Sequence, residues 1–241
     1  MPRVGADGPR NASIAVVGMA PAYNEIVIGK PFVGASGKIL DDALRKNNIN
    51  RRDVFVTNCT EEPLPTGGSF FDLPTQFQAT EVQRLKRELE EVNPNVIIPL
   101  GDDPLQVICG RDSITKWRGS ILETRPDFLK GKKAVPAYHP AFILRGMFKW
   151  LGIFNYIDIK RAVEESYDSS INLPKREIII RPDLKTVRDF ARECEQNEYL
   201  SFDIEGYYSQ YIRCVGIGYR KDLALCIPLT YGTGQSYWDP A

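Results

Sequence analysis

The sequence lacks several features that would point at once to a class of protein. No apolar run approaches the roughly 20 residues that a helix needs to cross a bilayer. Residues 1–11 contain no apolar segment of the kind that marks a secretory signal peptide. Lys plus Arg equals Asp plus Glu at 31 each, so the formal net charge is zero. Global charge therefore does not indicate a nucleic-acid-binding protein, and any DNA contact must come from a local patch.

Cysteine and histidine are also scarce. The five cysteines show no CxxC spacing and their number is odd, so we expect neither a disulfide framework nor a zinc site. This pattern favours a reducing cytoplasm, which would be the host cytoplasm if a phage encodes the chain. There is one histidine, His139, so imidazole chemistry in this chain has a single possible position.

The residues that are present predict an alternation of strands and helices. Hydrophobic residues make up 43% of the chain, which is enough for a packed core. Apolar runs predict buried strands at 13–18, 54–57, 95–100 and 133–138, and amphipathic spacing predicts helices at 39–47, 80–92, 104–109 and over most of 141–165. This alternation is typical of an α/β three-layer sandwich with a central parallel sheet, in which ligands bind beyond the carboxyl ends of the strands. Gly18, Asn58, Gly101 and His139 all fall on that edge.

The pattern changes after residue 165. Residues 166–176 are polar and contain Ser-Ser and a proline, so they are predicted to link a first domain, 1–165, to a second one, 177–241. The second domain is predicted to have a strand at 177–181, a helix at 183–197 and successive strands at 199–204, 213–219 and 223–229. Nothing before residue 241 closes this meander, so we expect the second domain to be truncated.

Four segments of the first domain carry a family resemblance. In chain order they are Gly18–Ala22 with Gly29–Gly34, Thr57-Asn58 followed by Pro63 and Pro65, Ile114–Gly119, and His139–Arg145. Together they resemble the motifs of the uracil-DNA glycosylase superfamily, above all the family 4 enzymes. In that family the first motif begins Gly-Glu-x-Pro-Gly and ends Arg-Pro-Phe-Val-Gly, and the last is His-Pro-Ala-Tyr-Leu-Leu-Arg. The resemblance implies an α/β domain that acts on a base flipped out of DNA.

The resemblance assigns roles in the base pocket. Phe32 would stack on the flipped base, and Asn58 would read its polar edge. His139 would donate a hydrogen bond to the pyrimidine carbonyl oxygen as the glycosidic bond breaks. Backbone amides around Ala20 would complete the pocket, and Tyr23 could stand against C5 of the ring and exclude a methyl group.

The resemblance also implies contacts to the DNA itself. Leu144 and Arg145 would enter the duplex and hold the gap, as apolar wedges do in other proteins. Arg118 is a candidate for phosphate contact, although a lone basic residue is often merely solvated. The partner is thus expected to be DNA, single- or double-stranded.

The first motif departs from the family at its catalytic acid. The second position, which is Glu in family 4, is Met19 here, and a methionine can neither orient nor activate water. The family 5 branch begins Gly-x-Ala-Pro-Ala, as this chain does, and uses an acid just after Phe-x-Gly. The chain has Ala35 and Ser36 there. Glu25 coincides with a second acidic position of the family 4 loop and is the candidate substitute.

A second departure concerns the cofactor. Family 4 enzymes carry an iron–sulfur cluster on four cysteines. Here no N-terminal cysteine pair exists, and Glu62 and Glu81 stand approximately where the two later cysteines are expected. Without thiolates the cluster cannot be ligated, so we predict none in the first domain.

The second domain carries a different signal at Asp203 and Glu205. Residues i and i+2 of a strand point to one face, so these two carboxylates would converge and could hold a divalent cation, Mg²⁺ or Mn²⁺. Residues 199–229 resemble the first motif of the 3′–5′ exonuclease domain in family A DNA polymerases, which has a ribonuclease-H-like sheet and uses such metals. The whole protein is then expected to be a phage-type DNA polymerase whose exonuclease and polymerase domains follow.

Three interpretations of the first domain stay open on the sequence alone. It binds uracil or a modified pyrimidine in DNA without efficient cleavage, it is an active uracil-DNA glycosylase, or it is a structural remnant that positions the polymerase. The lost carboxylate favours binding over catalysis. Retention of Phe32, Asn58 and His139 argues against a remnant.

Overall fold

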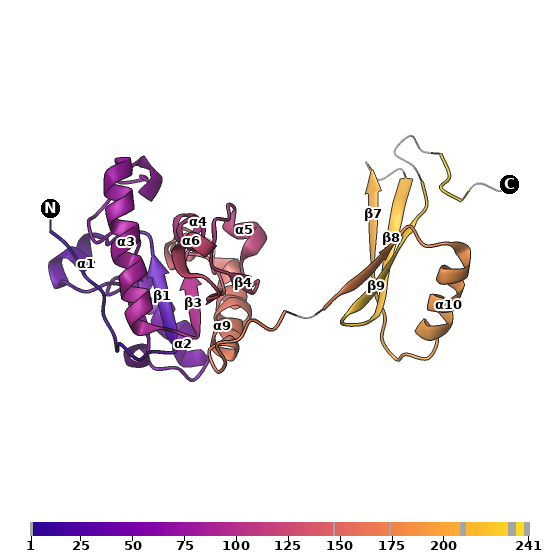
Figure 1. Cartoon of the computed structure of the whole chain (residues 1–241), viewed down its shortest axis with the longest axis horizontal. Coiled ribbons are helices and arrows are strands. Elements are labelled where there is room, and N and C mark those ends of the chain that lie inside the picture. The colour runs from indigo at the N-terminus through magenta and orange to yellow at the C-terminus, as the bar shows by residue number, and fades with distance from the viewer. Residues whose placement is uncertain (1, 147, 174, 208–210, 231–234, 239–241) are drawn as a thin grey trace. The chain divides into compact units, whose positions relative to one another are not determined.

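The chain folds into two compact units. A computed structural model describes residues 2–146, 148–173, 175–207, 211–230 and 235–238. The units are Met1–Ile171 and Asn172–Ala241, and each has a sheet of its own (Figure 1). Their division falls inside the polar segment 166–176. No helix in the described ranges is long and apolar enough to cross a membrane.

The first unit is built on a five-stranded, mostly parallel sheet. Its strands are β1 (Ile14–Gly18), β2 (Phe55–Asn58), β3 (Val96–Pro99), β4 (Leu122–Glu123) and β5 (Lys133–Ala134), in the spatial order β2-β1-β3-β5-β4. The first four in that order are parallel, and β4 runs antiparallel to β5. The residues of β1, β2 and β3 are buried, as their uninterrupted apolar runs predict. A mixed α/β fold with a central, mostly parallel sheet is thereby confirmed.

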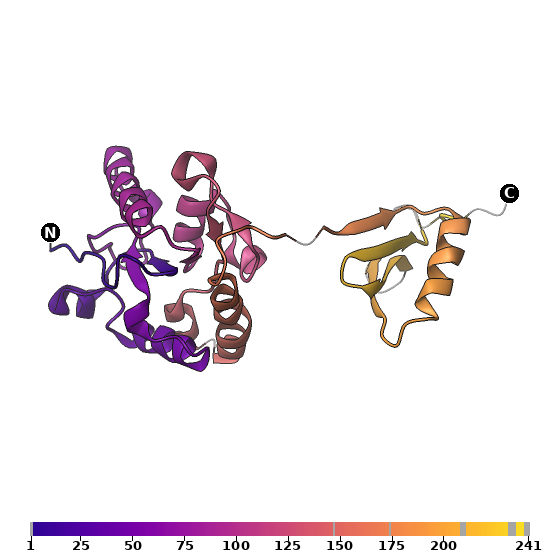
Figure 2. The same cartoon turned by 60° about the horizontal axis from the view of Figure 1, so that its bottom comes forward.

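Helices cover both faces of this sheet. They are α1 (Tyr23–Ile28), α2 (Ala35–Lys46), α3 (Thr75–Val92), α4 (Asp102–Cys109), α5 (Ile114–Trp117), α6 (Pro126–Leu129), α7 (Pro140–Leu144), α8 (Leu151–Ile153) and α9 (Lys160–Glu165). Short 3₁₀ turns at Arg51–Asp53, Phe70–Asp72 and Phe148–Trp150 and a π-helical segment at Phe154–Ile159 complete the unit. Helices α3, α4 and α6 lie on one face, and α2, α7 and α9 on the other (Figure 2).

Several element boundaries differ from the sequence prediction. The loop expected at 19–37 contains the helix α1, and α2 begins at Ala35 instead of residue 39. Gly37 lies in the first turn of this helix, where a Cβ would be 1.7 Å from the Phe32 carbonyl oxygen. Only a glycine allows the helix to approach Phe32 so closely. The strand expected at 133–138 is shortened to Lys133–Ala134, followed by a single bridge from Leu100 to Ala137, because Pro99 of β3 has no amide to donate to the chain between them.

The second unit has a four-stranded sheet and one helix among its described residues. Its elements are β6 (Glu177–Ile180), α10 (Leu184–Cys194), β7 (Ser201–Tyr207), β8 (Tyr211–Arg220) and β9 (Leu223–Pro228). The predicted meander of β7, β8 and β9 is confirmed, and β6 adds to β9 in parallel. Helix α10 packs on one face, where Phe190, Cys194 and Leu225 form a small core.

Candidate nucleobase-binding site

The parallel strands β1 and β2 end side by side at the carboxyl edge of the sheet. Gly18 and Asn58 are the paired terminal residues of these strands. A Cβ on Gly18 would lie 2.3 Å from Oδ1 of Asn58 and 2.7 Å from Cζ of Phe32. Only glycine leaves room for both side chains here, so the glycine that closes β1 is a requirement of the site.

Phe32 is held in an unusual backbone conformation. Its φ is +55°, in the left-handed region that a bulky residue rarely adopts, and its side chain is buried. The carboxylate of Glu25 accepts one hydrogen bond from the Phe32 amide and one from the Ala22 amide, each at 2.5 Å. Glu25 thereby ties together the two ends of the loop and offsets the strain at Phe32.

This placement changes the interpretation of Glu25 as the substitute catalytic acid. Only 7% of the residue is exposed, and both carboxylate oxygens already accept backbone amides. Burial raises the pKa of Glu25, and the two amide hydrogen bonds oppose that rise. The geometry fits a residue that shapes the loop better than one that activates a water molecule.

His139 faces Phe32 across the site. The two ring centroids are 5.8 Å apart and the planes are inclined by 38°. Nδ1 of His139 accepts a hydrogen bond of 3.1 Å from the Ala141 amide, so the neutral ring carries its proton on Nε2. Burial, followed by the nearby Arg145 cation, lowers the pKa of His139 to about 4. At neutral pH the ring is therefore an uncharged donor, as recognition of a carbonyl oxygen requires.

Asn58 offers a second polar group to the site. It is almost fully buried, and its Nδ2 atom has no hydrogen-bond partner among the described residues. A buried amide left without a partner costs about 1–3 kcal/mol. An acceptor on a bound ligand would remove that cost, which is the property expected of an amide that reads a base.

Two adjoining hollows open around these side chains. The base groove has a volume of about 800 Å³, and its lining includes Ala20, Tyr23, Glu25, Phe32 and His139. A second cavity of about 380 Å³ shares four lining residues with it, namely Met19, His139, Ala141 and Arg145. Met19, which the resemblance matches to the catalytic acid of family 4, thus lines both hollows.

Two carboxylates that sequence reasoning did not single out line the smaller cavity. Asp102 accepts a hydrogen bond of 2.7 Å from the Ile114 amide. Oδ2 of Asp103 accepts the Ser69 hydroxyl at 2.9 Å and the Phe70 amide at 2.6 Å. These contacts fix the loops beside the cavity. The only sequence signal for them was their position directly after β3, on the ligand-binding edge of the sheet.

Three of the remaining residues predicted to contact the base or the DNA, Tyr23, Leu144 and Arg145, lie at the mouth of the site. Tyr23 lines the groove with 78% of its surface exposed, and exclusion of a C5 methyl group stays a prediction. Leu144 is 38% exposed at the end of α7, and Arg145 beside it lines both hollows. Both are free to contact DNA, which also stays a prediction.

Arg118 is a correction to the sequence interpretation. Instead of pointing to solvent, its guanidinium forms a two-pronged ion pair with the fully buried carboxylate of Asp158, with Nε 2.9 Å from Oδ2. It also lies over the Tyr138 ring at 5.6 Å. A cation committed to a buried partner is not available to a phosphate, so Arg118 is a structural residue.

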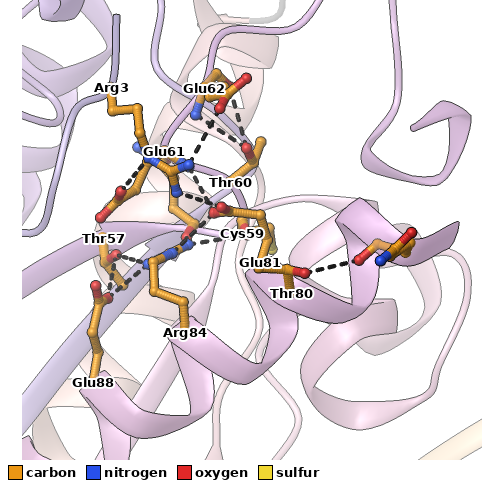
Figure 3. A network of polar contacts seen from close by, with 12 residues as sticks. Arg3, Thr57, Cys59, Thr60, Glu61, Glu62, Thr80, Glu81, Arg84 and Glu88 are labelled. Atoms are coloured by element: carbon orange, nitrogen blue, oxygen red, sulfur yellow. Dashed lines mark hydrogen bonds and ion pairs between the residues drawn. The ribbon is translucent and has the colours of Figure 1, made fainter. Parts of the chain in front are cut away.

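Charged residues fill the region where the family resemblance places cluster ligands. Arg3 pairs with Glu61, Glu62 and Glu81, and Arg84 pairs with Glu81 and Glu88 (Figure 3). Glu62 and Glu81 are carboxylates with basic partners, and the one thiol drawn there, Cys59, is buried with a raised pKa. Among the described residues no group of three or more His, Cys, Asp or Glu could hold a metal ion. An iron–sulfur cluster, which requires thiolates, does not fit this donor set.

In the second unit, Asp203 and Glu205 lie on β7 opposite Gly216 and Cys214 of β8. Ile217 and Leu225 face α10, so the alternation of side chains places both carboxylates on the opposite face of the sheet. The strand register thus puts the two side chains on one face, and their convergence on a metal ion stays a prediction. The two carboxylates alone do not amount to a metal site among the described residues.

The fold and the arrangement at the sheet edge define a domain of the uracil-DNA glycosylase class, and comparison with known proteins agrees. The model of the uracil DNA glycosylase superfamily matches residues 6–165, and the chain belongs to that superfamily. It is similar to the type-4 uracil-DNA glycosylase of Thermotoga maritima, with 34% identity over 159 residues that cover 65% of this chain and 79% of the relative. The type-4 enzyme of Archaeoglobus fulgidus is 34% identical over 143 residues, covering 57% of this chain and 69% of that enzyme.

A relative of another kind is the DNA polymerase of Bacillus phage SP01. It is 30% identical over 140 residues, which cover 57% of this chain but only 14% of the polymerase. The matched segment is therefore a small part of a much longer phage polymerase.

Proposed function

We propose that the first unit binds a uracil or modified pyrimidine flipped out of DNA and holds it without efficient cleavage. Membership of the uracil-DNA glycosylase superfamily supports DNA as the partner. Phe32 and His139 line one groove and supply a ring to stack on the base and a neutral donor. Asn58, beside Gly18 and the Phe32 ring, supplies a buried amide without a partner among the described residues. These are the features that recognition of a flipped base needs.

The observation that carries the proposal is the place of Met19. This side chain lines both hollows beside His139, where the relatives' motif has an acid. Stabilisation of the leaving base by the Nε2 proton of His139 remains possible. The missing carboxylate removes the group that would orient water against the sugar, and a positioned general base contributes about 10²–10⁴-fold to rate.

A single-turnover assay on a labelled single-uracil oligonucleotide tests this proposal, with the 241-residue chain, His139→Asn and Met19→Glu. Asparagine keeps the cap on the Ala141 amide but is too short to reach the place of Nε2. We expect negligible cleavage by the wild-type chain, uracil-dependent binding that His139→Asn weakens about tenfold, and cleavage at least 100-fold faster in Met19→Glu.

Other outcomes separate the two alternatives. Cleavage by the wild-type chain that His139→Asn abolishes would establish an active glycosylase, as the names of the type-4 relatives suggest. Glu25→Gln would then show whether that carboxylate contributes to the chemical step. Equal binding of uracil and cytosine oligonucleotides by the wild-type chain would leave a structural remnant or a reader of a base other than uracil.

We also propose that the chain is the N-terminal region of a DNA polymerase and that the second unit begins its 3′–5′ exonuclease domain. The similarity to the phage polymerase and the carboxylates of β7 support this. In the intact protein, Asp203 and Glu205 would contribute ligands to Mg²⁺ or Mn²⁺. Mn²⁺-dependent exonuclease activity of the full-length protein that Asp203→Asn abolishes is the expected result, and activity that survives this substitution would contradict it.

A further inference from the structure

A network of charges connects three segments that are distant in the sequence. Arg3 comes from the N-terminal segment, Glu61 and Glu62 follow β2, and Glu81 and Arg84 belong to α3. Figure 3 shows how these side chains converge beside the end of β2. The network therefore lies beside the end of the strand that carries Asn58.

Glu81 is the buried centre of the network. Only 1% of its side chain is exposed, and a buried carboxylate is tolerated only when it is well paired. Oε1 accepts from Arg3 at 2.5 Å, and Oε2 accepts from Nε of Arg84 at 2.9 Å and from the Glu61 amide at 3.1 Å. Glu81 thereby fixes the orientation of the Arg84 guanidinium.

Arg84 in turn binds the backbone at the end of β2. Its Nη2 donates to the Asn58 carbonyl oxygen at 2.7 Å and to the Cys59 carbonyl oxygen at 3.1 Å. On the other side of the same backbone, the Cys59 amide donates to the Gly18 carbonyl oxygen at 2.8 Å. The Asn58–Cys59 backbone is thus held between the guanidinium and β1.

We infer that Arg84, locked by Glu81, is a positioning residue that aligns Asn58 for reading the base. The carboxamide of Asn58 lies beside Gly18 and the Phe32 ring with little room, so a shift of the strand end displaces the buried amide relative to that ring. Stacking on Phe32 does not depend on that amide. Loss of Arg84 should therefore reduce selectivity between bases more than it reduces affinity for DNA. This inference rests on the proposed function of the first unit.

The test compares the ratio of dissociation constants for cytosine and uracil oligonucleotides in the full 241-residue chain. We expect Arg84→Met to reduce this ratio about tenfold, which corresponds to one misaligned hydrogen bond, and Arg84→Lys to restore it in part. Arg87→Met is the matched control, since Arg87 is an exposed cation on the same helix whose side chain, among the described residues, hydrogen-bonds only the Gln83 carbonyl oxygen.

A double-mutant cycle with Asn58→Ala distinguishes a positioning role of Arg84 from a purely structural one. If Arg84 acts through Asn58, Arg84→Met has no further effect on the ratio once Asn58 is alanine. An unchanged ratio in Arg84→Met, or an equal reduction with and without Asn58, would overturn the inference. Glu81→Gln, which removes the central charge but keeps an acceptor, gives the same comparison if Arg84→Met does not fold.

The same measurement separates this inference from the proposed function. A wild-type chain with no preference for uracil overturns both. A wild-type preference that Asn58→Ala reduces but Arg84→Met does not overturns only the positioning role.

Discussion

The two units differ in how far their apolar and charged side chains are buried. In the first unit, residues such as Leu85 and Ile98 are fully buried between helices and sheet, and even Glu81 and Asp158 are enclosed with partners. In the described part of the second unit, the core is small and large apolar side chains such as Phe202, 72% exposed, face solvent.

This difference bears on where a preorganised site can form. Glu25 holds the backbone of Phe32, and the strand register and the charge network hold the backbone of Asn58. Asp203 and Glu205 lie on a strand at the edge of its sheet, with exposed residues along it. A site needs a supporting shell of contacts, and the described residues supply one only in the first unit.

The largest effect expected within this comparison comes from the buried ion pair. Arg118→Ala leaves the buried Asp158 carboxylate without its partner. We expect this to lower the free energy of unfolding by about 3–5 kcal/mol. Urea unfolding followed by unit-specific amide signals should show a loss confined to the first unit, and Lys130→Ala, which removes an exposed cation, should have little effect. Equal destabilisation of both units would contradict their independence.

A second effect is confined to the first unit because the chain has one histidine. The folded-state pKa of His139 is lowered to about 4 from 6.5, so the unfolded chain takes up the proton first as the pH falls. Its contribution to stability is fully present above pH 6.5 and is lost progressively down to about pH 4, by roughly 3 kcal/mol.

The measurement is the difference in unfolding free energy between the wild-type chain and His139→Asn from pH 7 to pH 4. Taking this difference removes the contribution of other groups, including Asp158, whose pKa burial raises to about 6. A difference that does not change with pH would show that His139 is not held neutral in the folded unit.

The smallest effect is expected in the second unit. Phe202→Ser removes an apolar ring that is already exposed, so the free energy of unfolding should change by less than about 0.5 kcal/mol. Leu85→Ala, at a fully buried position of the first unit, should cost about 2–5 kcal/mol and serves as the contrast. A large loss in Phe202→Ser would mean that this face is covered in the folded protein.

Much of the architecture follows from the sequence because it is encoded locally. Apolar runs identify β1, β2 and β3, and amphipathic spacing identifies most of α3, because burial on one or both faces leaves a periodic trace. Helix α1 was missed because its residues have exposed apolar side chains such as Val27 and Ile28, and no amphipathic pattern marks it.

The polar interior was harder to predict. The spacing that predicts a helix at 80–92 did not single out a buried charge, yet Glu81 precedes Leu85 and Leu89 at steps of four and belongs to their buried stripe. That spacing was the available signal. Asp158 and Arg118 are 40 positions apart, and no local pattern shows that two such distant charges will meet. Pairings of this kind depend on the tertiary fold.

One contact of His139 couples the two ends of a short helix. By accepting the Ala141 amide, the imidazole caps α7, and the opposite end of that helix carries Leu144 and Arg145. Five helical residues span about 7.5 Å. The donor proposed for a flipped base and the side chains proposed to fill the space it leaves are therefore kept at a fixed separation. Whatever nucleotide the domain accepts must match that span.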